Sequence, residues 1–233
     1  MRPISINRSN LSQALWEAIF DHSEPQSFSM LSSLLAETVL LENLREQADY
    51  NTGSISTSAI WSIFSSCLYF QPKVVAEVGT FIGKSTFAAA SAMDVATKNS
   101  SGIFTCDSSN DIKLNLKTKT PIIQFPKTAS TDMFTELAKK GIRCDMLFLD
   151  GRLQEADLPL LSLILHDQSV FLLDDFEGTE KGCINSMLIM QSLDKTHHLV
   201  YPPSSEALLR RGFKDRCAVA MIVPRSLVMF TNQ

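Results

Sequence analysis

From residue 73 onward, short apolar runs alternate with longer segments in which apolar side chains recur at helical spacing. This alternation is typical of a mostly parallel sheet buried on both faces. Strands are predicted at Val74–Val78, Gly102–Cys106, Ile122–Phe125, Asp145–Leu149, Ser169–Leu173, His198–Tyr201 and Ala218–Val223. Helices are predicted over residues 56–69, 84–97, 131–140, 154–166 and 180–193. Residues 202–216, which join the last two strands, have little helical pattern and suit an antiparallel edge. The prediction is an α/β fold, with a Rossmann-like, mostly parallel seven-stranded sheet and helices on both faces.

The first 55 residues contain no strand candidate. Apolar positions recur at helical spacing over 10–22 and again over 27–49, with Pro25 between them. Because proline is unfavourable inside a helix, we predict two helices with a break at this position. The chain therefore divides into an N-terminal helical extension or cap, residues 1–55, and a Rossmann-like domain, residues 56–233. The leucine-rich extension is a candidate either to cover the cleft of the domain or to form a homodimer interface.

Composition and charge narrow the class of partner. Hydrophobic residues make up 45% of the chain and charged residues 20%, and the net charge is -4. Nucleic acid and membrane surfaces are not expected partners, because binding to them needs clustered basic residues. A small-molecule substrate is expected instead. The five cysteines have no metal-type spacing and indicate free thiols in a reducing compartment. With no signal-like start and no run of roughly 18 apolar residues, we expect a cytoplasmic protein.

A glycine-containing turn joins the first strand of the domain to the next helix. Gly79 and Gly83 enclose this turn, and ligands of open α/β sheets bind at such strand ends. The pair Lys84-Ser85 suggests a nucleotide-binding hydrolase, but a P-loop needs four residues between its glycines and this chain has three. A dinucleotide fingerprint would need glycine where Phe81 stands. The hydrolase is therefore kept as the weaker alternative.

The same turn matches a third pattern in full. Residues Glu77 to Gly83 form Glu-x-Gly-x-x-x-Gly, which resembles the first motif of class I S-adenosylmethionine (SAM)-dependent methyltransferases. The resemblance implies that the turn faces the methionine part of SAM. Asp107, at the end of the second strand, can accept hydrogen bonds from two ribose hydroxyls, or it can cap the loop that follows. The predicted cofactor-binding residues are Tyr50, Thr52, Glu77, Gly79, Thr80, Gly83, Ser85, Asp107, Ser108, Thr128, Ala129, Ser130 and Asp150.

Three carboxylates follow the fourth and fifth predicted strands: Asp150 after one, and Asp174 and Asp175 after the other. If these strands are neighbours, about 4.8 Å apart, the acids converge and need a cation or protons to offset their repulsion. Hard oxygen ligands favour Mg²⁺ or Ca²⁺. Here the chain resembles the metal-dependent small-molecule O-methyltransferases of the catechol and caffeoyl-coenzyme A type. The resemblance implies that Asp150, Asp174 and Asp175 hold a divalent ion, expected to be Mg²⁺, which grips the substrate.

The resemblance has one departure, at the catalytic base. The catechol enzymes carry a lysine three residues after the first Asp, where this chain has Leu153. Arg152 cannot act as a base near neutral pH, so Lys181 and His166 are the candidate substitutes. Asp150 is the residue that we predict to take part in catalysis. The predicted function is SAM-dependent methyl transfer to an oxygen of a small molecule, assisted by Mg²⁺. The alternative is a regulatory or scaffold protein that binds SAM without transferring its methyl group.

Overall fold

A seven-stranded sheet forms the centre of the protein, for which we describe residues 4–6, 10–48, 53–96, 100–109, 111–179 and 181–230 of a computed structural model. The strand order is β4-β3-β2-β5-β6-β8-β7. The strands are β2 (Val74–Val78), β3 (Gly102–Asp107), β4 (Ile122–Pro126), β5 (Cys144–Leu149), β6 (Leu165–Leu173), β7 (His197–Val200) and β8 (Ala220–Pro224). All neighbours are parallel except β8, which runs antiparallel to β6 and β7. The predicted Rossmann-like sheet and its antiparallel edge are therefore confirmed.

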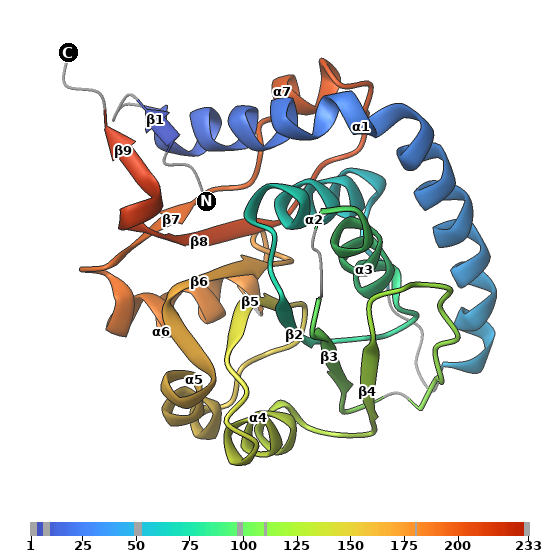
Figure 1. Cartoon of the computed structure of the whole chain (residues 1–233), viewed down its shortest axis with the longest axis vertical. Coiled ribbons are helices and arrows are strands. Elements are labelled where there is room, and N and C mark those ends of the chain that lie inside the picture. Colours follow the sequence, from blue (N-terminus) through green and yellow to red (C-terminus); the bar gives the residue numbers. More distant parts are fainter. Residues whose placement is uncertain are drawn as a thin grey trace.

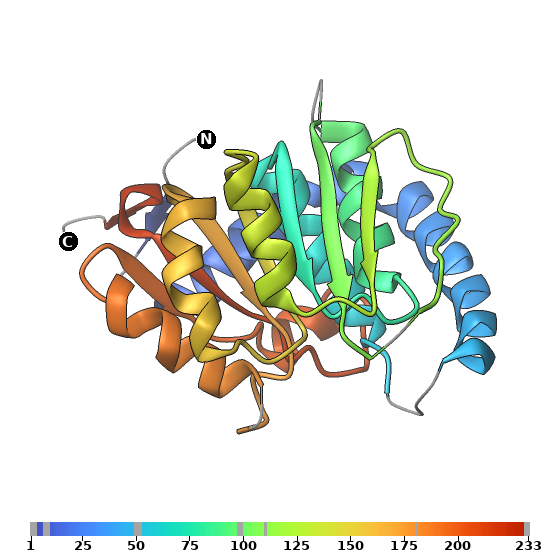
Figure 2. The same ribbon diagram turned by 90° about the horizontal axis from the view of Figure 1, so that it is seen from below.

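Helices cover both faces of the sheet (Figures 1 and 2). On one face lie α1 (Leu11–Leu41), α2 (Thr57–Phe70) and α3 (Lys84–Ala96), and on the other α4 (Ser130–Lys139), α5 (Leu158–Ile164) and α6 (Gly182–Leu193). Side chains of successive strand residues point to opposite faces of the sheet. They therefore pack alternately into the apolar core on one face and the apolar core on the other. Met146 and Phe148 of β5 pack with the first helix group, whereas Leu147 and Leu149 pack with the second. This two-sided burial explains why the central strands are continuous apolar runs.

The N-terminal prediction of two helices is wrong. Residues 11–41 form the single helix α1, followed by the 3-10 helix η2 (Glu42–Gln47). A proline inside a helix removes one backbone hydrogen bond and can bend the helix instead of ending it. Figure 1 shows α1 crossing the top of the molecule and then bending down one side. Trp16 and Phe20 are fully buried in the same apolar cluster as α2 and α3, so this extension shares the core of the domain.

Other elements differ in detail from the sequence pattern. The predicted helix over 154–166 is shorter, with η3 (Glu155–Asp157) and α5 separate and β6 already beginning at Leu165. The loop over 202–216 contains a short helix, α7 (Ser205–Leu209), whose first turn is capped by the Ser204 hydroxyl. The remaining elements are η4 (Arg225–Leu227) and a parallel pair of short strands, β1 (Ile4–Ile6) and β9 (Val228–Phe230). Within the described residues, we find no helix that could cross a membrane.

The strand order creates a crevice between β2 and β5. From β2 the chain continues to β3 and β4 on one side, whereas β5 and β6 lie on the other. The loops after β2 and β5 therefore leave the sheet in opposite directions, which is where open α/β sheets bind ligands. Two backbone hydrogen bonds hold these loops together at the base of the crevice, from the N–H groups of Asp150 and Gly151 to the Val78 carbonyl, both at 2.9 Å.

Candidate active site

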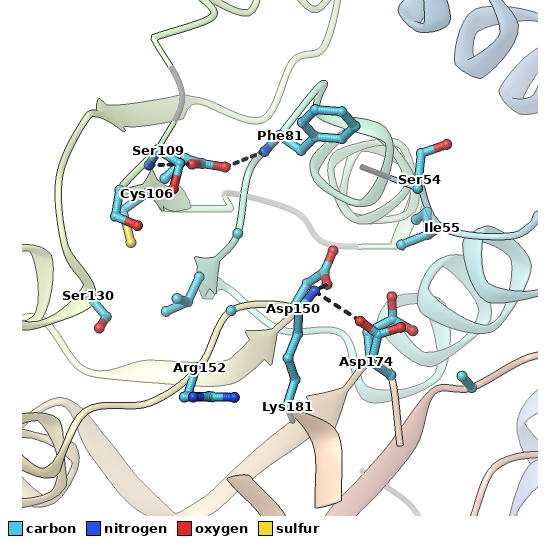
Figure 3. A pocket seen from close by; sticks show the side chains of 18 of the residues that line it. Ser54, Ile55, Phe81, Cys106, Ser109, Ser130, Asp150, Arg152, Asp174 and Lys181 are labelled. Carbon is cyan, nitrogen blue, oxygen red and sulfur yellow. Dashed lines mark hydrogen bonds and ion pairs between the residues drawn. The ribbon is translucent and has the colours of Figure 1, made fainter. Parts of the chain in front are cut away.

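A cavity of about 750 Å³ opens at the carboxyl ends of the parallel strands (Figure 3). Its walls come from the loops after β2, β3, β4, β5 and β6, and from Gly53–Ser56 just before α2. This volume lies within the range of about 300–1,000 Å³ that is usual for small-molecule sites. Nine of the predicted cofactor or metal residues line the cavity, although they lie far apart in the sequence: Gly79, Asp107, Ser108, Thr128, Ala129, Ser130, Asp150, Asp174 and Asp175.

The glycine turn after β2 is fixed to the neighbouring loops. Gly79 has φ +100°, and a Cβ added there would lie 3.0 Å from the carbonyl carbon of Asp150 and from the nitrogen of Gly151. Only glycine meets both conditions without strain. The N–H groups of Gly79 and Thr80 donate to the Cys106 carbonyl at the end of β3, at 2.9 and 3.1 Å. The turn therefore presents its backbone to the cavity at a fixed place.

Asp107 connects this turn to the loop after β3. Its carboxylate is buried and accepts hydrogen bonds from the N–H of Phe81 at 2.8 Å and from the N–H of Ser109 at 2.9 Å (Figure 3). The predicted capping role is therefore present. Each carboxylate oxygen can accept more than one hydrogen bond, and Asp107 also lines the cavity. The same side chain can cap its loop and receive donors from a ligand.

Four residues of the predicted cofactor set do not line the cavity: Glu77, Thr80, Gly83 and Ser85. Glu77 is 2% exposed and accepts hydrogen bonds at 2.5 Å from Ser85 Oγ and from Thr86 Oγ1, both in the first turn of α3. Burial raises the pKa of Glu77, although the hydrogen bond from Ser85 acts in the opposite direction. Thr80 shares a hydroxyl hydrogen bond with Thr105 of β3. These residues support the turn from within the protein.

Lys84, the residue behind the hydrolase alternative, also lies away from the cavity. Its ammonium pairs with Glu42 of η2 and donates to Ser54 Oγ at 2.9 Å. Burial raises the pKa of Glu42, but hydrogen bonds from Lys84, Ser54 and Arg45 outweigh it and lower that pKa to about 2. This cluster joins η2, α3 and the Gly53–Ser56 segment at the cavity rim. The arrangement gives Lys84 a structural role and does not support phosphate binding.

The loop after β4 forms the wall of the cavity opposite the acids. Thr128, Ala129 and Ser130, which the sequence places at the predicted adenine side, line it. The Thr128 N–H donates to the Asp107 carbonyl at 2.9 Å, and Ser130 Oγ donates to the buried Asp157 at 2.6 Å. The Ser130 hydroxyl thus holds the loop as well as facing the cavity. Tyr50 and Thr52, predicted to lie over the cofactor, are outside the described residues.

Strained backbone gathers at the same edge of the sheet. Phe81, Lys127 and Asp175 have φ values of +43°, +48° and +53° and directly follow or lie close after β2, β4 and β6. Non-glycine residues seldom adopt such values, and they persist where surrounding contacts enforce them. Strain of this kind is common at ligand sites, which agrees with the location of the cavity.

The three predicted acids do meet. Strands β5 and β6 are parallel neighbours with Leu149 opposite Leu173, so Asp150 and Asp174 leave the sheet side by side. Burial raises the pKa of Asp150, and the charge of Asp174 raises it further. Burial likewise raises the pKa of Asp174, with a further contribution from Asp175. Both directions follow first from desolvation of the carboxylates and then from repulsion among them.

A lysine ammonium lies among these acids. Lys181 Nζ is 3.1 Å from Asp150 Oδ1 and 2.9 Å from Asp175 Oδ2. Figure 3 shows the Lys181 side chain reaching up to Asp150 beside Asp174. Burial lowers the pKa of Lys181, but the charge of Asp150 and hydrogen bonds to both acids outweigh it and raise that pKa above its ordinary value. Lys181 therefore stays protonated here, and the prediction that it serves as the base is not supported.

The arrangement does not fit a divalent metal ion. Among the residues that the structure describes, no group of three or more His, Cys, Asp or Glu side chains is placed to hold one. Mg²⁺ needs near-octahedral oxygen ligands at about 2.0–2.1 Å, and its site would contain the ammonium of Lys181. Asp150, Asp174 and Asp175 are thus brought together as predicted, but around a lysine.

His166, the other candidate base, lies at the wrong end of the sheet. It is the second residue of β6, whereas Asp174 directly follows the last one. At about 3.3 Å per residue, the strand separates the two by roughly 25 Å. His166 Nε2 instead contacts Asp145 Oδ1 at 3.1 Å. It cannot act as a base in the cavity.

Two residues that the sequence did not single out hold the acidic cluster in place. Asn185 of α6 is fully buried; its Oδ1 accepts from the Leu153 N–H at 3.0 Å and its Nδ2 donates to the Gly151 carbonyl at 2.9 Å. A Cβ added at Gly182 would lie 2.7 Å from the backbone of Phe176, so α6 begins in tight contact with the loop after β6. The sequence signal that could have pointed to Asn185 was an amide residue within the mostly apolar segment that forms α6.

Comparisons with known proteins support the fold. No family model and no curated protein matches the sequence. Among solved structures, an O-methyltransferase from Bacillus cereus in complex with S-adenosylhomocysteine (SAH) is similar with a TM-score of 0.52 and 10% identity, covering 85% of this chain and 91% of that one. TomG, an O-methyltransferase from Streptomyces achromogenes involved in tomaymycin synthesis, was solved with SAM and gives 0.54 at 13% identity, over 85% and 90%. The chain has the fold of class I SAM-dependent methyltransferases.

Proposed function

We propose that this chain transfers a methyl group from SAM to an oxygen of a small molecule. The observation that carries the proposal is a single cavity with two different ends. One end has the buried Asp107 carboxylate and the Thr128–Ser130 loop, the other has Asp150, Asp174 and Lys181, and the glycine turn lies between them, against the backbone of Asp150. A nucleoside suits the first end and a polar acceptor suits the second. The shared fold with O-methyltransferases supports this division.

The residues of the first end fit SAM. Asp107 has lone pairs free to accept from both ribose hydroxyls, while its backbone contacts keep it oriented. Gly79 lets a ligand approach the turn closely, because no side chain stands between its backbone and the cavity. When bound, SAM supplies a methyl group: as the acceptor oxygen bonds to the methyl carbon, the carbon–sulfur bond breaks and its electron pair stays on sulfur.

The residues of the second end orient the acceptor and take its proton. Asp174 lines the cavity and is not one of the two carboxylates paired with Lys181. We assign to Asp174 the proton that leaves the acceptor hydroxyl. Positioning and preorganised charge supply most of the rate of such a displacement. Asp150, predicted to take part in catalysis, acts by holding Lys181 at the acceptor end.

The proposal is tested in two steps with the full chain. Calorimetric titration with SAH, beside ATP and GTP, is expected to give binding for SAH alone. Turnover of methyl-labelled SAM is then measured with a panel of phenols, hydroxy acids and amines. Binding of ATP or GTP in place of SAH would overturn the proposal in favour of the hydrolase. Binding of SAH without turnover of any acceptor in the panel would favour a SAM-binding regulatory or scaffold protein.

A further inference from the structure

We propose that the ammonium group of Lys181 takes the place of a divalent metal ion in this site, so that the acceptor is held by one oxygen and methyl transfer needs no metal. The inference rests on the proposed function and identifies the Lys181 ammonium as the group that binds the acceptor. It starts from the contacts of Lys181 Nζ with Asp150 Oδ1 at 3.1 Å and with Asp175 Oδ2 at 2.9 Å.

The acids require a positive charge, and Lys181 supplies it. Asp174 is buried and Asp150 is partly buried at the ends of neighbouring strands, with Asp175 next to them. Carboxylates packed in this way repel one another unless a cation lies among them. A lysine side chain is ordinarily protonated near neutral pH. A second cation at the same place would be repelled by the ammonium, so Mg²⁺ and Lys181 exclude each other.

The lysine is fixed in place by its own helix. Lys181 directly precedes Gly182, whose tight contact with the backbone of Phe176 leaves no room for a Cβ. Four residues after Lys181, Asn185 hydrogen bonds to the backbone of Gly151 and Leu153, immediately after Asp150. The start of α6 is therefore bound to both loops that carry the acids. The backbone that carries Lys181 is thus held against the acids, and the side chain reaches them through its two ion pairs.

The number of donors limits the class of acceptor. An ammonium group has three N–H donors, and two of them are engaged by Asp150 and Asp175. One donor is left for the acceptor, and Lys181 lines the cavity where the acceptor would lie. A metal ion can bind two neighbouring oxygens of a catechol at once, whereas one remaining N–H can bind only one. The acceptor class is therefore a single hydroxyl, without the adjacent pair of oxygens that chelation needs.

The first test measures metal binding directly and needs no substrate. The metal-stripped full chain, with SAH present, is titrated with Mg²⁺ and with Ca²⁺ in a calorimeter. The variants are Lys181→Met and, as a matched control, Lys195→Met, which changes an exposed lysine just after α6. We expect no binding to wild type or Lys195→Met at millimolar ion, and binding to Lys181→Met that a further Asp174→Asn change removes. Binding of Mg²⁺ by wild type, or its absence in Lys181→Met, would overturn the proposal.

The second test uses turnover and separates this inference from the proposed function. Wild-type turnover of a simple phenol is expected to be unchanged by EDTA and no slower than that of a catechol. Lys181→Met should lose about 10²- to 10³-fold in turnover, the usual effect of removing one such donor, while its affinity for SAH stays within about threefold. Loss of wild-type turnover in EDTA would overturn the role of Lys181. Failure of wild type to bind SAH would instead overturn the proposed function, whatever the ion titration gives.

Discussion

The replacement Asp107→Asn tests the cofactor end of the cavity with little change in shape. In the wild type, the two carboxylate oxygens accept the N–H groups of Phe81 and Ser109 and still have lone pairs for a ligand. The amide keeps one acceptor and turns an NH₂ group toward the other backbone N–H. It therefore removes the charge that would strengthen both ribose hydrogen bonds, and it leaves one backbone donor unpaired.

The size of the effect follows from these contacts. A hydrogen bond to a charged group contributes about 1.5–3 kcal/mol, and the amide loses one acceptor and the charge on the other. The loss therefore lies between one and two such bonds, about 1.5–6 kcal/mol, or roughly 10- to 10⁴-fold in the dissociation constant of SAH. The unpaired N–H should lower the free energy of unfolding by about 1–3 kcal/mol. The control Asp111→Asn removes one charge from an exposed side chain of the same loop and should change neither quantity.

The assay compares SAH with its 2′-deoxy analogue by calorimetry on the wild type and on both variants. Wild type and Asp111→Asn should bind the deoxy analogue at least about tenfold more weakly, whereas Asp107→Asn should bind both ligands alike. This comparison cancels any general damage to the loop, since such damage affects both ligands equally. If Asp107→Asn still discriminates against the deoxy analogue, Asp107 only caps its loop and does not bind the ribose.

Three further changes address other parts of the site. Gly79→Ala should weaken SAH binding in calorimetry by roughly tenfold or more, because its Cβ would clash with the backbone after β5. The control Gly212→Ala also has a positive φ, +85°, but no atoms near the new Cβ, and it should leave SAH binding unchanged. Asn185→Ala leaves two buried backbone groups unpaired and should lower the free energy of urea unfolding by about 2–4 kcal/mol; a loss below about 0.5 kcal/mol would refute its anchoring role. The pKa of Glu42 is lowered from 4.5 to about 2, so its contribution to stability is complete above the unfolded-state value and is lost as the pH falls through the folded one. The Tm difference between wild type and Glu42→Gln should therefore shrink from neutral pH toward pH 2, and an increase on acidification would contradict the ion cluster.

The sheet was predictable because burial on two faces leaves a strong local signal. Each central strand must offer apolar side chains to both helix layers, as Met146 and Leu147 do. The path of α1 was not predictable in the same way. Pro25 is a local signal for a break, but the burial of Trp16 and Phe20 in the domain core is a tertiary effect that the sequence pattern does not show.

The candidate site likewise has parts that the local sequence predicts and parts that depend on tertiary contacts. Asp150 and Asp174 were predictable neighbours, since parallel strands release their carboxyl-terminal residues at one edge of the sheet. The location of Lys181 was not, because the chain from residue 175 to 181 has no periodic pattern from which to derive its path. Its approach to the acids depends on close packing at Gly182 and on hydrogen bonds from Asn185, both of which are long-range contacts.

The charge of the cavity argues for a cationic ligand over a phosphorylated one. Five acidic side chains and three basic ones line it: Asp107, Asp150, Asp174, Asp175 and Glu177 against Arg152, Lys181 and Arg216. Carboxylates stand at the end that would hold a ribose and at the end that would hold the acceptor, so the net charge of the lining disfavours the triphosphate of a nucleotide. The positive sulfonium of SAM is instead attracted, and Lys181 offsets only part of the negative charge. This distribution of charge therefore favours SAM, and it disfavours the nucleotide that Lys84-Ser85 suggests from the sequence.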